Sequence, residues 1–140
     1  MAYTAKDFSS FTVGDTVTFS KTIGEADVVL FAGVSGDQYP LHVDAEYAKR
    51  SRFGQRVAHG MLSASLLSTV AGLMLGTPGG IYVEQTLRFR RPVFLGDTLT
   101  ARSELVEIDQ AKRRLHCATT IVNQHGETVI EGAAILQKDE

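Results

Sequence analysis

The chain has 140 residues, of which 44% are hydrophobic and 21% charged, so one domain over residues 1–140 with its own core is expected. Its net charge of −2 argues against a general nucleic-acid-binding protein, which is usually strongly basic. A single cysteine, Cys117, excludes an internal disulfide framework and a cysteine-rich zinc site, and its position in an apparent strand predicts a buried thiol.

The first third of the chain predicts a strand followed by two short helices. Residues 16–20 alternate polar and apolar side chains, as a half-buried strand does. Residues 25–32 change to a helical pattern with acidic residues in the first turn, and this helix should end near residues 33–36. Residues 44–49 form a second short helix, for which Asp44 is the expected N-cap.

The segment between these helices, residues 37–42, is expected to be an irregular loop that carries an acid and an imidazole. Gly36 can adopt backbone angles closed to other residues, and Pro40 fixes its own φ and restricts Tyr39. Asp37 and His42 stand five residues apart on this loop. A carboxylate and an imidazole so placed could share one water or one substrate proton, which general acid–base chemistry requires.

Residues 59–75 predict the main helix. Leu62, Leu66, Val70 and Leu73 recur at helical spacing, and Ser65, Ser68 and Gly72 form a second stripe of small residues. Because the run contains no charge, we expect it to be buried nearly all round, yet it is too short and too interrupted by Ser and Thr to span a bilayer. Residues 76–80 should end the helix. With no hydrophobic signal-peptide run at the N-terminus, a cytoplasmic protein is the default expectation.

The remainder of the chain predicts long strands. They cover residues 81–90, 98–108, 113–123 and 128–137, and the last three are joined by connections short enough for hairpins. Ile81, Val83, Leu87 and Phe89 should share one face of the first of these strands. One long apolar helix between a first strand and a run of antiparallel strands implies an α+β fold, with the sheet curving around the helix.

Three blocks of the sequence resemble the MaoC-like, R-specific enoyl-CoA hydratases, a group with the hot-dog fold. The resemblance covers residues 11–138, and its blocks stand in the family's order and spacing. The blocks are Ser35-Gly36-Asp37-x-x-Pro40-Leu41-His42-x-Asp44, His59-Gly60-Met61-Leu62, and Phe89-x-x-Pro92-Val93-Phe94-x-Gly96-Asp97.

This resemblance implies a reaction, a substrate and an assembly. The reaction is the reversible hydration of a trans-2-enoyl-CoA to an (R)-3-hydroxyacyl-CoA, with no cofactor and no metal, and an acyl-carrier-protein thioester could replace the CoA thioester. Asp37 and His42 match the family's catalytic dyad, which holds one water, and the backbone N–H of Gly60 matches its oxyanion donor. The family's single-domain members form homodimers in which two sheets join edge to edge, so a homodimer or higher assembly is implied.

Four further residues are candidates for substrate binding. Ser68 aligns with a serine near the dyad in some members, and Arg90 occupies a position that is often basic and could contact CoA, although it could equally be part of a solvated strand face. His59 either contacts substrate or braces the start of the helix. Tyr39 replaces the asparagine that usually precedes the proline, which puts the substrate range in question.

Two rival functions remain open at this point. A hot-dog thioesterase would bind the same acyl-CoA but release free CoA, and a non-catalytic acyl-binding subunit would bind without turnover. The retained Asp37–His42 pair favours the hydratase. His116 and His125 lie apart, in an expected strand and turn, and with the single cysteine they make no metal-ligand set. Acyl chain length, physiological direction and assembly beyond a dimer stay open.

Overall fold

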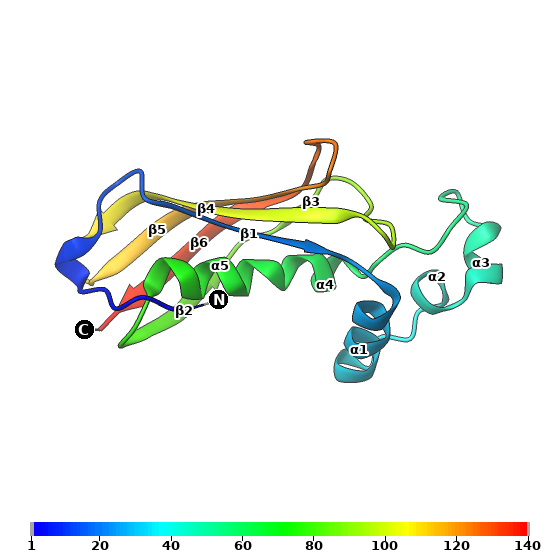
Figure 1. Cartoon of the computed structure of the whole chain (residues 1–140), viewed down its shortest axis with the longest axis horizontal. Coiled ribbons are helices and arrows are strands. Elements are labelled where there is room, and N and C mark those ends of the chain that lie inside the picture. The colour runs from blue at the N-terminus through cyan, green and yellow to red at the C-terminus, as the bar shows by residue number, and fades with distance from the viewer. Residues whose placement is uncertain (1, 140) are drawn as a thin grey trace.

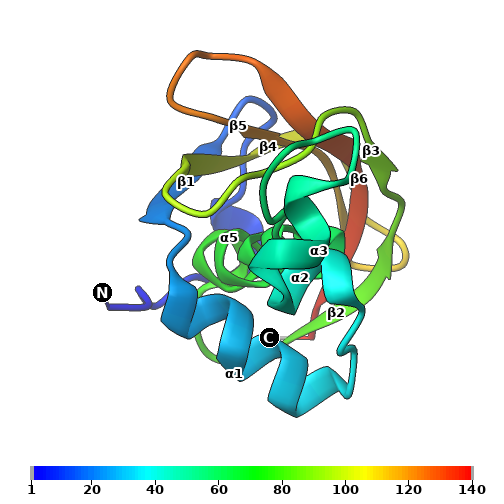
Figure 2. The same cartoon turned by 90° about the vertical axis from the view of Figure 1, so that its right-hand side faces the viewer.

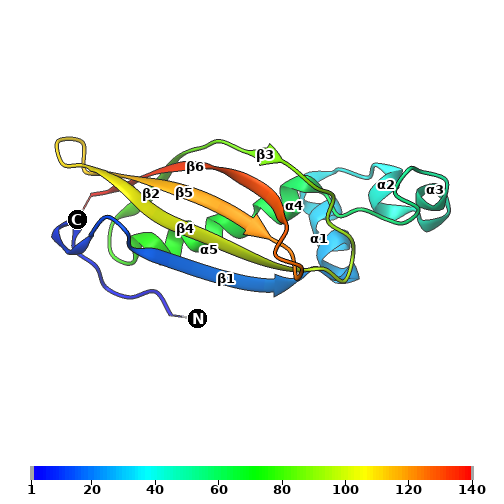
Figure 3. The ribbon, with the colours of Figure 1, turned by 90° about the horizontal axis from the view of Figure 1, so that it is seen from above.

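The computed structural model describes residues 2–139, which fold as one curved antiparallel sheet around a helix. The sheet has the order β1-β4-β5-β6-β2, and the two-residue strand β3 pairs with β6 beside this path. Figure 1 shows the helix lying along the concave face of the sheet, and Figure 3 shows the same sheet from above. The strands are β1 (Thr16–Thr22), β2 (Gly80–Gln85), β3 (Arg88–Phe89), β4 (Thr98–Asp109), β5 (Arg114–Val122) and β6 (Thr128–Lys138).

The helices lie at both the centre and one end of the molecule. The central helix comprises α4 (Gly60–Ala64) and α5 (Leu66–Leu75), and a 3-10 turn, η1 (Phe8–Ser10), precedes β1. Three more helices, α1 (Glu25–Ser35), α2 (Pro40–Val43) and α3 (Ala45–Lys49), project together beyond one end of the sheet (Figure 1). The predicted α+β hot-dog fold is therefore confirmed, with the expected strands at close to the expected bounds.

The core lies between the central helix and the sheet, in two clusters. The cluster nearer the projecting helices contains Val28, Leu62, Val70 and Ile121, all of them buried. The other cluster gathers η1 and the far end of α5 against β4, β5 and β6, and includes the buried thiol of Cys117. Burial raises the pKa of this thiol, as expected for an inert structural cysteine. No helix in residues 2–139 has the length and the apolar character needed to cross a membrane.

The central helix differs from its prediction in two respects. It is interrupted at Ser65, whose hydroxyl donates to the carbonyl of Leu62 at 2.5 Å, so that the hydrogen bonds tighten locally to the i→i−3 spacing. The helix is also not buried all round. Met61, Ser65 and Ser68 are exposed, at the i, i+4, i+7 spacing of one face, which borders the edge strand β2. The expectation of all-round burial is therefore wrong for the single chain.

The strand predicted over residues 81–90 is divided into β2 and β3. The chain bends at Thr86, which exchanges two hydrogen bonds with Ala133: its N–H donates to the Ala133 carbonyl at 2.9 Å, and its Oγ1 accepts from the Ala133 N–H at 3.0 Å. This bend brings the Thr86 carbonyl oxygen to within 1.8 Å of where a Cβ on Gly132 would lie, so only glycine fits there. Ile81, Val83 and Phe89 are exposed rather than packed in the core.

The segment from residue 37 to residue 42 is less irregular than predicted. Pro40 to Val43 form the single-turn helix α2, because Pro40 stands at its first position, where a fixed φ suits a helix and the missing N–H costs nothing. Asp44 then caps α3 as predicted, since its Oδ1 accepts from the Tyr47 N–H at 3.0 Å. In Figure 2, α2 and α3 lie in front of the end of the central helix, and α1 runs below them.

Candidate active site

Asp37 is positioned by the way α1 ends. Gly36 closes the helix in the left-handed conformation, with φ of 78°, and its N–H donates to the Ala32 carbonyl at 2.9 Å. The Asp37 N–H then donates to Ser35 Oγ at 3.1 Å, and Asp37 Oδ1 accepts from the Tyr39 N–H at 3.1 Å. These short-range bonds hold the exposed carboxylate at the start of the turn that leads into α2.

His42 is fixed by the segment that precedes the central helix. Its Nδ1 lies 2.6 Å from the carbonyl oxygen of Val57, so Nδ1 must carry the ring proton and Nε2 of the neutral ring is left as an acceptor. Arg56 Nε donates to the His42 carbonyl at 2.6 Å, and Arg56 also pairs with Glu25 on α1 at 2.6 Å. The arrangement selects the tautomer in which Nε2 can accept a proton, as a general base requires.

His59 connects the two halves of the site. Its ring is stacked on His42, with centroids 4.0 Å apart and an interplanar angle of 26°, and its Nε2 donates to the Asp37 carbonyl at 3.0 Å. The residue is only 2% exposed, and its Nδ1 has no hydrogen-bond partner among the described residues. His59 thus links the Asp37 backbone to the start of α4, a contact that favours the structural alternative for this residue.

The Asp37 carboxylate, His42 and His59 form a compact cluster. One ligand-type atom from each lies within 4.8 Å of the other two, yet no direct hydrogen bond joins the carboxylate to either ring among the described residues. The spacing would admit a metal ion. However, the in-plane lone pairs of two stacked rings lie in separate, nearly parallel planes and converge poorly on one point, which is unfavourable geometry for a shared ion. A small polar molecule held between the carboxylate and His42 suits the spacing better.

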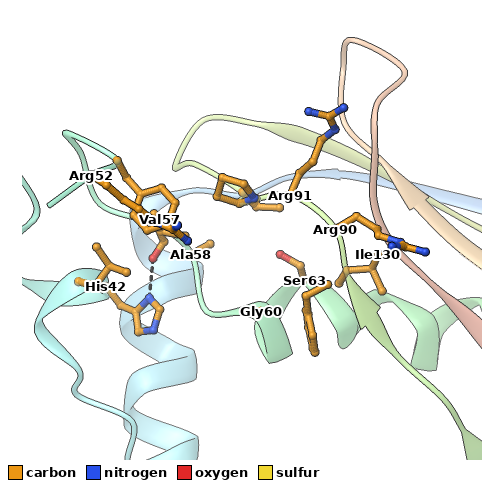
Figure 4. Close-up of a pocket in the computed structure, with 14 residues that line it drawn as sticks. His42, Arg52, Val57, Ala58, Gly60, Ser63, Arg90, Arg91 and Ile130 are labelled. Atoms are coloured by element: carbon orange, nitrogen blue, oxygen red, sulfur yellow. Dashed lines mark hydrogen bonds between the residues drawn. The ribbon is translucent and has the colours of Figure 1, made fainter.

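A cavity of about 300 Å³ opens beside His42. Figure 4 shows His42 and Val57 on one side of it and Arg90 and Ile130 on the other, with the start of α4 at Gly60 below. We call this space the arginine cavity, because Arg52, Arg90 and Arg91 all line it. The N–H groups that begin a helix have no intrahelical acceptor, so Gly60 offers a free donor at this wall. The ring of Phe89 packs against Gly60, where an added Cβ would lie 2.8 Å from Cε1.

Ser68 lies elsewhere. It lines a second cavity of about 530 Å³ between the exposed face of the central helix and β2, with walls that include Phe31, Met61 and Leu87. The polar groups of this helix–strand cavity are Ser65, Ser68, Tyr82, Glu84 and Gln85. Burial raises the pKa of Tyr82 to about 12, and its hydroxyl donates to Gln85 Oε1. Ser68 is thus not brought into the cavity that His42 lines. Phe31, which lines the helix–strand cavity, contacts the ring of His59 with centroids 4.8 Å apart.

Tyr39 lies at the outer side of the cluster and lines neither cavity. Its ring is 54% exposed and lies 6.0 Å from His42 and, edge-on, 6.3 Å from Tyr47, measured between centroids. Hydrogen bonding to Tyr39 raises the pKa of Tyr47. The tyrosine that replaces the usual asparagine is therefore part of an aromatic wall on the outer face of the site.

Sequence reasoning missed Arg56, Val57 and Ser63. Arg56 and Val57 act on His42 from 14 and 15 residues away, which no local pattern could reveal. Ser63 is fully buried, lines the arginine cavity and has a hydroxyl without a partner among residues 2–139. The only local sign of a special role for Ser63 is that it is a polar residue in an apolar run. The helical pattern alone predicts an ordinary helix residue there.

Comparisons with known proteins converge on one family. The family model of the MaoC like domain matches residues 8–127. An (R)-specific enoyl-CoA hydratase of Rhodospirillum rubrum is 43% identical over 127 residues, covering 91% of this chain and 88% of that protein. A 3-hydroxybutyryl-CoA dehydratase of Methylorubrum extorquens is 39% identical over 130 residues, covering 93% and 82%. The solved structure of R-hydratase PhaJ1 from Pseudomonas aeruginosa in the unliganded form superposes with a TM-score of 0.89, at 44% identity, covering 95% of this chain and 85% of that one.

Proposed function

This chain belongs to the MaoC-like domain family, and we propose that it is a hydro-lyase that reversibly hydrates trans-2-enoyl-CoA to (R)-3-hydroxyacyl-CoA. One observation carries the proposal. The Asp37 carboxylate and a ring nitrogen of His42 lie within 4.8 Å without a direct bond, and His42 lines the same cavity as the start of the central helix. Two hydrogen bonds through a shared water span such a gap.

The dyad supplies both proton transfers. Asp37 and His42 hold the water between them, and because the Val57 carbonyl fixes the proton of the His42 ring on Nδ1, Nε2 can accept a proton from that water. The water oxygen attacks C3 of the enoyl group, and the proton that it loses is passed to C2 on the same face. We assign the two groups jointly, because coupled acids and bases need not have separable roles.

The thioester oxygen becomes negative while C3 is attacked. We assign the Gly60 N–H as its donor, since a free N–H at a helix start and the helix dipole both favour negative charge. Loss of such a donor typically lowers kcat by about 100-fold or more. Phe89 packs against the side of Gly60 where a Cβ would lie, so a side chain at this position would have to displace the Phe89 ring.

The four residues predicted to bind substrate differ in their surroundings, and we assign them different roles. Arg90 lines the arginine cavity but is paired with Glu131, to which its Nε donates at 2.7 Å, so its charge is already compensated. Ser68 belongs to the helix–strand cavity, which could take an acyl chain. His59 is assigned to positioning, and Tyr39 to the outer wall that limits the approach of substrate to His42.

The test of the function is a hydration assay on purified protein. We expect crotonyl-CoA to lose its enoyl-thioester absorbance and the product to be the (R)-3-hydroxy enantiomer, with related substrates from C4 to C12 defining the chain length. Added EDTA should leave the rate unchanged, because the proposed steps use only side chains, backbone and water. Formation of the (S) product would contradict the proposed geometry.

Two further measurements on the same protein separate the rival functions. Release of free CoA from acyl-CoA, followed with a thiol reagent, would indicate a thioesterase instead of a hydratase. Tight binding of enoyl-CoA with no turnover of any chain length would indicate a non-catalytic subunit. His42 favours the hydratase over both, because its Nδ1 is bonded to the Val57 carbonyl and its Nε2 is left to accept a proton from water.

We also propose that the protein is a homodimer in which two sheets join through β2. This strand is at the edge of the sheet, since β6 is its only partner among the described strands. An edge of this kind is a ready template for another strand, and Ile81 on it is 58% exposed. The exposed Met61 on the neighbouring helix face, at 56%, extends the uncovered apolar surface. A single domain over residues 1–140 and a cytoplasmic location, where acyl-CoA thioesters are metabolised, complete the proposal.

The dimer predicts a specific effect of charge on the β2 edge. Wild-type protein should have about twice the 15.2 kDa mass of the chain in light scattering, and Ile81→Lys should shift it towards the monomer, because the lysine would be desolvated at the new interface. Val106→Lys, at another exposed apolar position but on the interior strand β4, is the matched control and should stay dimeric. A monomeric wild type would contradict the proposal.

A further inference from the structure

The arginine cavity is positively charged although the whole chain is slightly acidic. Three arginines and His42 line it and no carboxylate does, whereas the net charge of the chain is −2. Two of the arginines have partners outside the cavity: Arg90 pairs with Glu131, and Arg91 pairs with Glu127 at 3.2 Å. Arg52 is the exception, because no carboxylate pairs with it in the part of the chain that the structure describes.

Arg52 is nevertheless held in place. Its guanidinium lies over the ring of Phe53, 4.7 Å from the centroid, while the residue as a whole is exposed at the cavity wall. In Figure 4 it lies on the same side of the cavity as His42 and Val57, opposite Arg90. A stacked guanidinium keeps its N–H donors in a defined direction, which suits recognition of an anion.

We propose that Arg52 binds the nucleotide phosphates of the coenzyme A moiety and so makes this chain selective for CoA thioesters. The proposal rests on the proposed function and adds to it the residue that recognises the CoA carrier. The acyl and pantetheine parts of the substrate carry no charge that needs a cation, whereas the nucleotide carries several phosphate charges. The uncompensated arginine of a cavity that reaches the proposed oxyanion donor, Gly60, is the group positioned to meet them.

The experiment compares two substrates that share their reacting group. Crotonyl-CoA carries the nucleotide and crotonyl-pantetheine does not. For crotonyl-CoA, Arg52→Gln should raise KM about tenfold with little change in kcat, since a charge-assisted hydrogen bond to a phosphate is lost. For crotonyl-pantetheine, Arg52→Gln and wild type should have the same KM. The KM difference for crotonyl-CoA should shrink as salt is added.

Two control variants accompany Arg52→Gln. Arg52→Lys retains the charge without the planar fork and should recover part of the affinity. Arg50→Gln removes an exposed positive charge two residues away, outside the cavity, and should behave as wild type with both substrates.

A titration without turnover keeps this inference separate from the function. Free CoA, followed by calorimetry, should bind Arg52→Gln about tenfold more weakly than wild type, whereas pantetheine should not distinguish them. Equal KM changes for both thioesters, or no change for either, would overturn the role of Arg52. The role of Arg52 would also be overturned if wild type preferred crotonyl-acyl-carrier-protein over crotonyl-CoA and Arg52→Gln lost this preference. Wild type that hydrates neither thioester would refute the hydratase, and the CoA titration would still decide the role of Arg52.

Discussion

Asp37→Asn and His42→Asn are each expected to lower kcat for crotonyl-CoA hydration by about 1,000-fold, the middle of the range for a lost general acid or base. Each variant removes the chemistry and preserves the local structure. Asparagine at position 37 keeps the Oδ1 that accepts from the Tyr39 N–H. Asparagine at position 42 can place its amide N–H where Nδ1–H donates to Val57, and it has no equivalent of Nε2.

The double variant provides the sharper measurement. If the two groups hold one water and act as a unit, Asp37→Asn combined with His42→Asn should be little slower than either single variant. Asp109→Asn, which alters a carboxylate that caps the turn at Lys112, is the matched control and should keep wild-type turnover. Near wild-type kcat in either site variant, at an unchanged melting temperature, would remove that residue from the dyad.

Gly132→Ala is expected to destabilise the fold by about 3 kcal/mol, at the upper end of the range for overpacked positions. A Cβ on Gly132 would lie 1.8 Å from the Thr86 carbonyl oxygen and 2.7 Å from its carbon, so backbone must move. That movement would separate Thr86 from Ala133, which anchors the bend between β2 and β3. The measurement is urea unfolding at matched protein concentration, because a dimer's stability depends on concentration.

A glycine-to-alanine substitution at Gly33 should stabilise the fold, in contrast to the one at Gly132. Gly33 lies in α1, is exposed, and has nothing within 4 Å of an added Cβ. Gly33→Ala should therefore raise the free energy of unfolding by about 0.5–1 kcal/mol, the difference in helix propensity between the two residues. A Gly132→Ala variant within 0.5 kcal/mol of wild type would show that the bend at Thr86 relaxes at little cost.

Local pattern was sufficient wherever a short stretch of chain decides its own structure. The alternation of β4, β5 and β6, the Asp44 cap and the end of α1 at Gly36 are all determined by neighbouring residues, and they were predicted close to their bounds. The bend at Thr86 was not predictable, because it depends on Ala133 and Gly132 in a strand more than 40 residues away. The exposed helix face was missed because an uncharged run gives no sign of which side meets the sheet.

For the site, the sequence alone named the residues that we propose for the chemistry: Asp37 and His42 on one short segment, and Gly60 at a helix start. Only the tertiary structure decided how these residues are held. The tautomer of His42 depends on the Val57 carbonyl, and the division between a cavity with Arg52 and a cavity with Ser68 depends on which side of the central helix each faces. These are contacts between segments far apart in the chain, and local sequence cannot specify which of them form.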